Sequence, residues 1–267
     1  MRRSCCRRET PVKRIAFWAL HYGKEYLPWS VRAVQDSVDE LHAIYVDRPS
    51  FGHVTTRPCP ETELQLQDAF SRFAKKPVVW HRGHFHNEGE HRDQIFDIAR
   101  RWAVDQVIVV DADEIVDSRT ASAMLDEAAS RVERSFRVRF LHFWRSIKWV
   151  CRDVSTPVRI WNVHQPPLEG EIRYQIAPYY HFGYAQSVEL MRYKWEIHGH
   201  LPELRPGWLE KKFIPWKPGD LDVHPTCGPG PACPNGFWCP EPLDEATRTK
   251  LVPLLGDHPY FNLEVIP

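Results

Sequence analysis

The chain has 267 residues, of which 43% are hydrophobic and 26% charged, a balance typical of a folded globular protein and unlike that of a disordered or fibrous chain. Its 35 lysines and arginines equal its 35 aspartates and glutamates, so total charge gives no argument for nucleic acid, an anionic membrane or an acidic substrate. Residues 1–14 nevertheless hold six basic side chains and one acidic one, leaving 29 basic against 34 acidic groups elsewhere, which predicts a mildly acidic globule with a basic tail at 1–12.

We expect neither a secretion signal nor a membrane span near the start of the given sequence. Its apolar run at 15–20 is six residues long, which is too short for either. Seven cysteines, an odd number, fit a reducing compartment better than a disulfide framework. We therefore expect a cytoplasmic protein without a membrane partner.

The first half of the chain alternates short apolar runs with segments of helical spacing. Unbroken apolar runs suit strands buried on both faces of a parallel sheet, whereas apolar residues three or four apart suit helices. Strands are expected at 15–20, 41–46, 78–80 and 106–110, with helices at 28–38, 61–73 and 91–102. This alternation predicts the α/β class, with a mostly parallel sheet flanked by helices.

The second half of the chain changes character. A helix is expected at 120–132, an alternating strand at 136–140, another strand at 158–163 and a helix at 187–195. Eight prolines between 215 and 242 do not suit ordinary helix or sheet, so this segment is expected to be irregular. The expected division is a folded domain at 13–214, with halves at 13–117 and 118–214, and a Pro/Cys-rich extension at 215–267.

The strongest predicted strand runs directly into acidic residues in the sequence VIVVDADE at 107–114. Ligands of open α/β sheets bind at the carboxyl ends of strands. Asp111 and Asp113 share a face if the extended geometry continues, because side chains repeat at every second position. Two such carboxylates suit Mg²⁺ or Mn²⁺, which complete their shells with water and substrate phosphates. The alternative is a solvated acidic turn that caps the next helix.

With its flanking elements, this motif resembles the GT-A fold of family-2-like glycosyltransferases. The first 120 residues give an apolar strand, a helix containing LPWSV, a strand ending in Asp47, an arginine-bearing helix and VIVVDADE. The resemblance implies that Asp47 binds the nucleobase or ribose, that Arg92 and Asp111 lie at the donor, and that Asp111 and Asp113 hold the metal on its diphosphate. The family's usual Asp-Asp-Gly-Ser is here VDRPSFG at 46–52, so only Asp47 carries over. The alternatives are a capping role for Asp47 and a solvated helical role for Arg92.

A histidine downstream is the predicted third metal ligand. The segment YYHFGY at 179–184 resembles a family segment that follows the acceptor region, in which a histidine closes the metal site. We assign this role to His181, because neutral imidazole is a good ligand and the nearby glycine permits close backbone approach. The alternatives are a hydrogen-bonded core histidine, or ligation by His198 or His200 instead.

The predicted catalytic base comes from a glycine-containing acidic segment. An inverting transfer needs a carboxylate that removes the acceptor hydroxyl proton, and family placement puts it between the Asp-x-Asp strand and the late histidine. Glu169 and Glu171 fall in that window, although a solvated turn explains them equally. Sugar or base rings are candidates for stacking on Trp144, Trp149 and Trp161, with core packing as the alternative.

A Cys-rich segment at 224–239 is a candidate structural zinc site. His224, Cys227, Cys233 and Cys239 supply four candidate ligands within 16 residues. Their spacing lacks the paired Cys-x₂₋₄-Cys knuckle of common zinc sites, which counts against this interpretation. Cys5 and Cys6 are most simply thiols of the basic tail.

The leading functional hypothesis is therefore a metal-dependent glycosyltransferase that uses a nucleoside-diphosphate sugar, UDP-linked on the family resemblance, with inversion. Its acceptor is a glycan, a lipid-linked sugar or a protein, and a hydroxylated DNA base is compatible with the arginines and tryptophans at 131–161. Two alternatives remain open. One is nucleotidyl or phosphoryl transfer, which also uses paired aspartates. The other is a non-enzymatic nucleic-acid-binding module that uses the basic tail.

Overall fold

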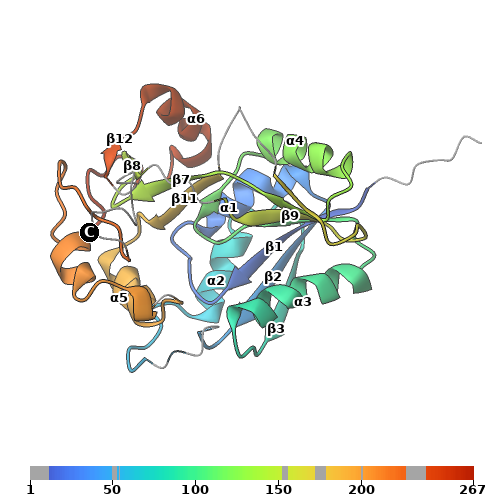
Figure 1. The fold of residues 1–267 in the computed structure, drawn as a ribbon, viewed down its shortest axis with the longest axis horizontal. Coiled ribbons are helices and arrows are strands. Elements are labelled where there is room, and N and C mark those ends of the chain that lie inside the picture. Colours follow the sequence, from blue (N-terminus) through green and yellow to red (C-terminus); the bar gives the residue numbers. More distant parts are fainter. Residues whose placement is uncertain are drawn as a thin grey trace, which may run out of the picture.

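A computed structural model describes residues 12–49, 53, 55–151, 156–171, 179–199, 201–226 and 239–267 (Figure 1). The described residues form two sheets. The larger has seven strands in the order β10-β6-β9-β4-β1-β2-β3, and the smaller has five in the order β12-β8-β7-β11-β5. Residues 1–11 of the basic tail predicted at 1–12, which include Cys5 and Cys6, lie outside the described residues. None of the helices in the described part of the chain has the length and apolarity that a membrane span requires.

The larger sheet is mostly parallel, which confirms the predicted fold class. Its central strands β1 (Arg14–Leu20), β2 (Glu40–Val46), β3 (Val78–Gly83) and β4 (Gln106–Val109) all run parallel. Next to β4, β9 (Val158–Asn162) is antiparallel to both β4 and β6 (Ser135–Arg137), and β10 (Glu169–Glu171) is parallel to β6. The apolar runs at 15–20 and 106–110 became strands because both of their faces are covered.

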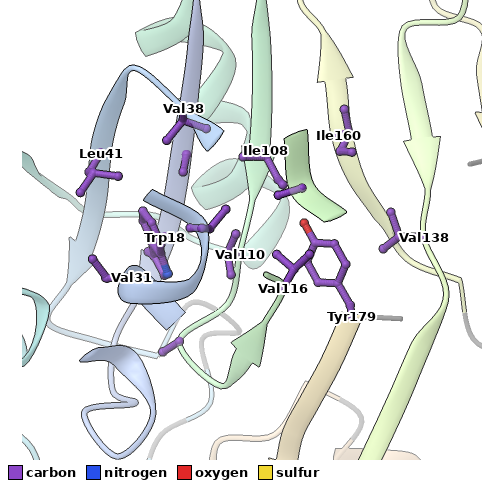
Figure 2. Packing of buried hydrophobic residues seen from close by; sticks show 14 of the residues in the cluster. Trp18, Val31, Val38, Leu41, Ile108, Val110, Val116, Val138, Ile160 and Tyr179 are labelled. Atoms are coloured by element: carbon purple, nitrogen blue, oxygen red, sulfur yellow. The ribbon is translucent and has the colours of Figure 1, made fainter. Parts of the chain in front are cut away.

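Helices cover the two faces of this sheet. Alternate residues of β1 belong to different clusters, with Trp18 in one and Phe17 in the other. The Trp18 cluster contains residues of α1 (Leu27–Val34), α2 (Glu63–Ser71) and α4 (Ser118–Ala129), and the Phe17 cluster contains residues of α3 (Glu88–Arg101). Figure 1 places α3 and α4 on opposite sides of the sheet, and Figure 2 shows the Trp18 cluster from close by.

The helix boundaries follow local capping chemistry. Thr62 forms a capping box with Gln65 at the start of α2, and the Asn87 and Asp117 side chains accept backbone N–H groups at the starts of α3 and α4. The helix predicted at 28–38 is shorter than expected. It ends as α1 at Val34, and a 3₁₀ turn follows at Gln35–Ser37.

The smaller sheet corrects one prediction. The alternating residues at 136–140 are not one strand, because β6 belongs to the larger sheet and β7 (Phe140–Trp144) to the smaller. Between them, the Val138 N–H donates to Pro157 O, while Arg139 O accepts from the Tyr179 N–H. The chain therefore exchanges one sheet's partners for the other's within two residues. The other strands of this sheet are β5 (Glu114–Ile115), β8 (Trp149–Cys151), β11 (Tyr179–Tyr184) and β12 (Glu241–Pro242).

The C-terminal part of the chain is more regular than its prolines suggest. After α5 (Val188–Glu196), a 3₁₀ turn at Leu201–Glu203 and a π-helical turn at Leu209–Phe213 precede β12 and α6 (Glu245–Leu255). Within the described part of the segment at 215–242, the pairing of Glu241–Pro242 with β8 corrects the expected irregularity, and α6 follows that segment. Residues 227–238, the centre of the Pro/Cys-rich segment, lie outside the described residues.

The last eleven residues pack against α1. The Asp257 carboxylate accepts hydrogen bonds from the Trp29 indole at 2.9 Å and from Arg32 at 2.7 Å. The His258 ring stacks on Tyr26 with 4.4 Å between centroids, and the Ile266 side chain is fully buried. This end of the extension therefore contributes to a hydrophobic core.

Candidate active site

A cavity of about 230 Å³ opens at the carboxyl ends of β1 and β4. The loop after β1 lines one part of it, and the acidic turn after β4 lines another. The start of α3, the middle of β11 and the last turn of α5 complete the wall. Five residues singled out from the sequence line this cavity together, namely Arg92, Asp111, Asp113, His181 and His198.

The loop after β1 lies unusually close to the acidic turn. Gly23 has a φ of +121°, and a Cβ atom there would lie 2.4 Å from the Cβ of Ala112, between the two aspartates. Ser30 supports the same turn, because its hydroxyl accepts the Trp18 indole N–H at 2.9 Å and lies 3.4 Å from Asp111 O. A residue without a side chain is therefore needed at position 23.

Replacing Gly23 by alanine is expected to lower the free energy of unfolding by about 2–4 kcal/mol, from backbone strain and overpacking combined. The matched control is Gly219→Ala, because Gly219 has a φ of +99° with nothing within 4 Å of an added Cβ. That variant carries only the backbone strain, about 1 kcal/mol. Urea unfolding of both variants separates the two effects, and equal losses would show that the contact with Ala112 is not limiting.

Asp111 is held by two arginines. Its Oδ2 atom accepts Arg159 Nη2 at 2.9 Å and Arg92 Nη2 at 3.4 Å. Arg159 is buried between β9 and the turn, where it also bonds the fully buried Glu114 carboxylate at 2.6 Å. Burial raises the pKa of Asp111, but the two guanidinium charges outweigh it and hold the pKa well below its usual range. Asp111 is therefore ionised at neutral pH.

Glu114 shows the cost of this burial most clearly. Its side chain has no solvent exposure, and burial raises its pKa even though Arg159 favours the charged form. Its Oε2 atom also accepts the Asp111 backbone N–H at 3.1 Å. The Arg159–Glu114 pair thus fixes the backbone of the acidic turn as well as the Asp111 side chain.

Asp113 is bound to residues that follow β11. Its Oδ2 atom accepts the Gln186 amide at 2.8 Å and lies 3.4 Å from Lys194 Nζ, and its backbone oxygen accepts the Phe182 N–H at 2.8 Å. Only 12% of the Asp113 side chain is exposed. The carboxylate is therefore oriented by an amide and a lysine.

His181 points one ring nitrogen at the cavity side of Asp113. Its Nδ1 atom lies 2.7 Å from His142 Nδ1, and its Nε2 atom lies 3.8 Å from Asp113 Oδ1. Burial lowers the pKa of His181 to about 4, so its ring is neutral at pH 7. A Cβ atom on Gly183 would lie 2.6 Å from Nε2, so the glycine leaves room for this ring.

The divalent cation implied by the resemblance does not fit these side chains as they lie. Asp111 is bonded to two arginines, Asp113 is paired with Lys194, and His181 faces another histidine through Nδ1. Across the described residues, no three histidines, cysteines or acids are arranged to hold a metal ion. Asp111, Asp113 and His181 are gathered in one cavity without forming a cation cage.

Asp47 lies in a neighbouring hollow of about 570 Å³. It is 64% exposed and lies 3.4 Å from His84 Nδ1. Pro49 lines both this hollow and the cavity. The structure therefore places Asp47 beside the cavity and not within it.

The predicted base residues are not brought to the cavity by described contacts. Glu169, on β10 at the far edge of the larger sheet, pairs with Arg137 and lines a separate hollow with Trp161. The side chain of Glu171 lies outside the described residues, as does His200. Glu169 is not among the described residues that line the cavity, and its role as the base stays a prediction.

The remaining sequence predictions have other surroundings. Trp144 is fully buried beside Trp208, which favours the core interpretation, and Trp149 donates to Glu264 at 3.1 Å. Neither of them, nor Trp161, is among the described residues that line the cavity. Of the proposed zinc ligands, Cys227 and Cys233 lie outside the described residues.

Sequence reasoning missed Arg159, Gln186 and Lys194. Arg159 sits between apolar residues of a strand, where alternation predicts a solvated side chain, yet only 7% of it is exposed. Gln186 and Lys194 follow the His-Phe-Gly-Tyr segment, whose contacts depend on how β11 pairs with β5. The only feature of the sequence that points to Gln186 and Lys194 is their position after His181, the candidate metal ligand.

Comparisons with known proteins give distant fold likenesses. No protein-family model matches the chain, and neither does any curated protein. Similar solved structures include a cytidylyltransferase from Leptospira borgpetersenii (12% identity, TM-score 0.36, 57% of this chain and 60% of that one). A second is a protein provisionally described as a nucleotide-diphospho-sugar transferase from Desulfovibrio desulfuricans G20 (11% identity, TM-score 0.33, 57% of this chain and 64% of that one). A third is S. aureus TarS 1–349 in complex with UDP (13% identity, TM-score 0.37, 70% of this chain and 64% of that one). The chain thus spans less than two thirds of each of these structures. These TM-scores are too low to support an argument about function.

Proposed function

We propose that this chain is a transferase that moves a sugar from a nucleoside-diphosphate sugar to an acceptor hydroxyl. The observation that carries the proposal is the cavity at the ends of β1 and β4, which joins two carboxylates, Asp111 and Asp113, with two cations, Arg92 and Lys194. The ends of parallel strands are where α/β sheets bind ligands. Both kinds of charge are useful for a donor that carries hydroxyls at both ends and phosphates between them.

Each kind of side chain has a chemical role toward such a donor. Carboxylates accept hydrogen bonds from sugar and ribose hydroxyls, and ionised acceptors make the strongest of these bonds. Guanidinium and ammonium groups stabilise the negative charge that develops on the departing diphosphate. Because the Asp113 and Lys194 side chains are 12% and 14% exposed, their charges are poorly screened by water.

Other parts of the reaction remain proposals from the family resemblance. These are a UDP-linked donor, inversion at the sugar carbon, recognition of the base or ribose by Asp47, and Glu171 as the base. The proposed acceptors are a glycan, a lipid-linked sugar or a protein, with a hydroxylated DNA base as a further class. The hollow around Asp47 adjoins the cavity through Pro49, which supports its assignment to the nucleoside end of the donor.

The test is a donor panel with UDP-, GDP- and dTDP-sugars, in buffer with Mn²⁺ and in buffer with EDTA, read as released nucleoside diphosphate. At least one donor is expected to turn over, and Asp113→Asn is expected to lower kcat/KM about a hundredfold. The matched control is Asp97→Asn, whose carboxylate is 57% exposed on α3 and pairs only locally with Arg100.

Failure of every donor to be hydrolysed or bound contradicts the proposal. Two further arms identify the alternatives. Pyrophosphate release from CTP or UTP with a sugar phosphate indicates nucleotidyl transfer. Salt-sensitive DNA binding that is lost on deleting residues 1–14, without any donor turnover, indicates a nucleic-acid-binding module.

A further inference from the structure

Lys194 occupies a position in the cavity that the family resemblance does not explain. It comes from α5, and its Nζ atom lies 3.0 Å from Gly183 O and 3.4 Å from Asp113 Oδ2. An ammonium group has three N–H donors; besides the two oxygens, Nζ lies 5.6 Å from the centre of the Tyr184 ring, and the side chain lines the cavity. Its side chain is 14% exposed.

The Lys194 ammonium group lies beside the Asp113 carboxylate, where a metal ion would bind, and it already supplies the positive charge that the ion would supply. A divalent cation bound there must displace Lys194 from the carboxylate or lie beside a second positive charge. Asp111 offers no better site, because Arg159 and Arg92 place two positive charges within 3.4 Å of its Oδ2 atom, and these charges repel a cation at the same carboxylate. Each carboxylate of the acidic turn is thus already neutralised by a side chain of this chain.

The same cations have the chemistry of a phosphate-binding site. Arg92 is 29% exposed and lies at the wall of the cavity, so its guanidinium can bond a phosphate while it remains near Asp111. Lysine binds phosphate as a point charge, and arginine binds it through paired N–H groups. Together they offer N–H donors on two cationic groups to a diphosphate, which must share these cations with Asp111 and Asp113.

From these contacts we infer that Lys194 and Arg92 bind the donor diphosphate in place of a divalent cation, so that transfer proceeds without metal. This inference rests on the proposed function. In the step, the bond between the sugar carbon and the β-phosphate oxygen breaks, and its electron pair stays on that oxygen. The acceptor oxygen bonds the sugar carbon, and its proton passes to the base. Lys194 and Arg92 neutralise the charge that accumulates on the diphosphate.

The first test compares donor turnover by the wild type in EDTA and in Mn²⁺. The two rates are expected to agree within about twofold. Lys194→Met is expected to lower kcat/KM in EDTA about a hundredfold, the scale of losing one stabilising group at a developing charge. Lys194→Arg is expected to retain more than a tenth of the activity. The matched control is Lys148→Met, since Lys148 bonds Glu264 at 3.0 Å outside the cavity.

The second test needs no turnover. Mn²⁺ alone is titrated into the wild type, Lys194→Met and Lys194→Arg, and bound ion is measured by electron paramagnetic resonance. Removing the ammonium frees the Asp113 carboxylate, so Mn²⁺ binding is expected to be tightest in Lys194→Met, at least tenfold tighter than in the wild type or in Lys194→Arg. Circular dichroism confirms that each variant is folded.

The outcomes separate this inference from the proposed function. Turnover that requires Mn²⁺ and stops in EDTA overturns the inference and leaves the proposed function intact. Equal Mn²⁺ affinity in the wild type and Lys194→Met also overturns it. Failure of every donor defeats the proposed function, and the inference falls with it. A Lys194→Met variant that does not fold is replaced by Lys194→Gln in both tests.

Discussion

Replacing Arg159 by methionine is expected to lower the free energy of unfolding by about 3–5 kcal/mol, the cost of breaking one side of a buried ion pair. Arg159 bonds Glu114 at 2.6 Å and Asp111 at 2.9 Å, and Glu114 is fully buried. Without the guanidinium, the Glu114 carboxyl must take up a proton or remain as an uncompensated buried charge. Urea unfolding at pH 7 measures the loss.

Two controls make this result specific. Arg100→Met removes an arginine that is 58% exposed and paired only with Asp97, so its effect is expected to stay within about 0.5 kcal/mol. Arg159→Met combined with Glu114→Gln removes both charges and is expected to recover part of the loss. An Arg159→Met variant as stable as the wild type would show that the pair does not hold the acidic turn in place.

Ending the chain after residue 256 is expected to abolish cooperative folding. The deletion removes the Asp257 bonds to Trp29 and Arg32, the His258 ring stacked on Tyr26, and the buried Ile266. It exposes the ring of Trp29, which is 3% exposed in the full chain. Each such large apolar side chain contributes about 1.5–3 kcal/mol by burial, so the sum approaches the 5–15 kcal/mol by which whole domains are stable.

Thermal unfolding followed by circular dichroism measures this effect. The matched control is Leu263→Ser, which changes a residue in the same segment that is 36% exposed and is expected to leave the melting temperature nearly unchanged. A truncated chain with a sharp transition near that of the full chain would show that residues 257–267 are not needed for folding.

The sequence predicts the elements whose burial is uniform and misses those whose partners are distant. β1 and β4 are evident because both of their faces are apolar. β6 and β7 are not separable, because Phe136 and Phe140 keep the same alternation whichever sheet receives them. α6 escaped notice because only Leu251 and Leu255 of it are buried, and Pro253 stands between them.

The residues of the candidate site likewise fall into those that the sequence predicts and those that it misses. Asp111 and Asp113 could be placed at a strand end because strand period and polarity are local properties. Their counter-charges could not, because Arg159 and Lys194 approach from β9 and α5, and those contacts are set by the order of strands in two sheets. The sequence therefore predicts the two acids of this cavity and Arg92, but not Arg159 and Lys194, which pair with the same acids.

The acidic turn joins the two sheets. β4 of the larger sheet enters it, and β5 leaves it to pair antiparallel with β11 of the smaller sheet. A molecule bound to Asp111 and Asp113 is thus held at the seam between two otherwise separately bonded layers. Its binding free energy resists any hinge-like opening of one layer from the other, so occupancy of the cavity raises the melting temperature of the whole chain in proportion to the logarithm of ligand concentration.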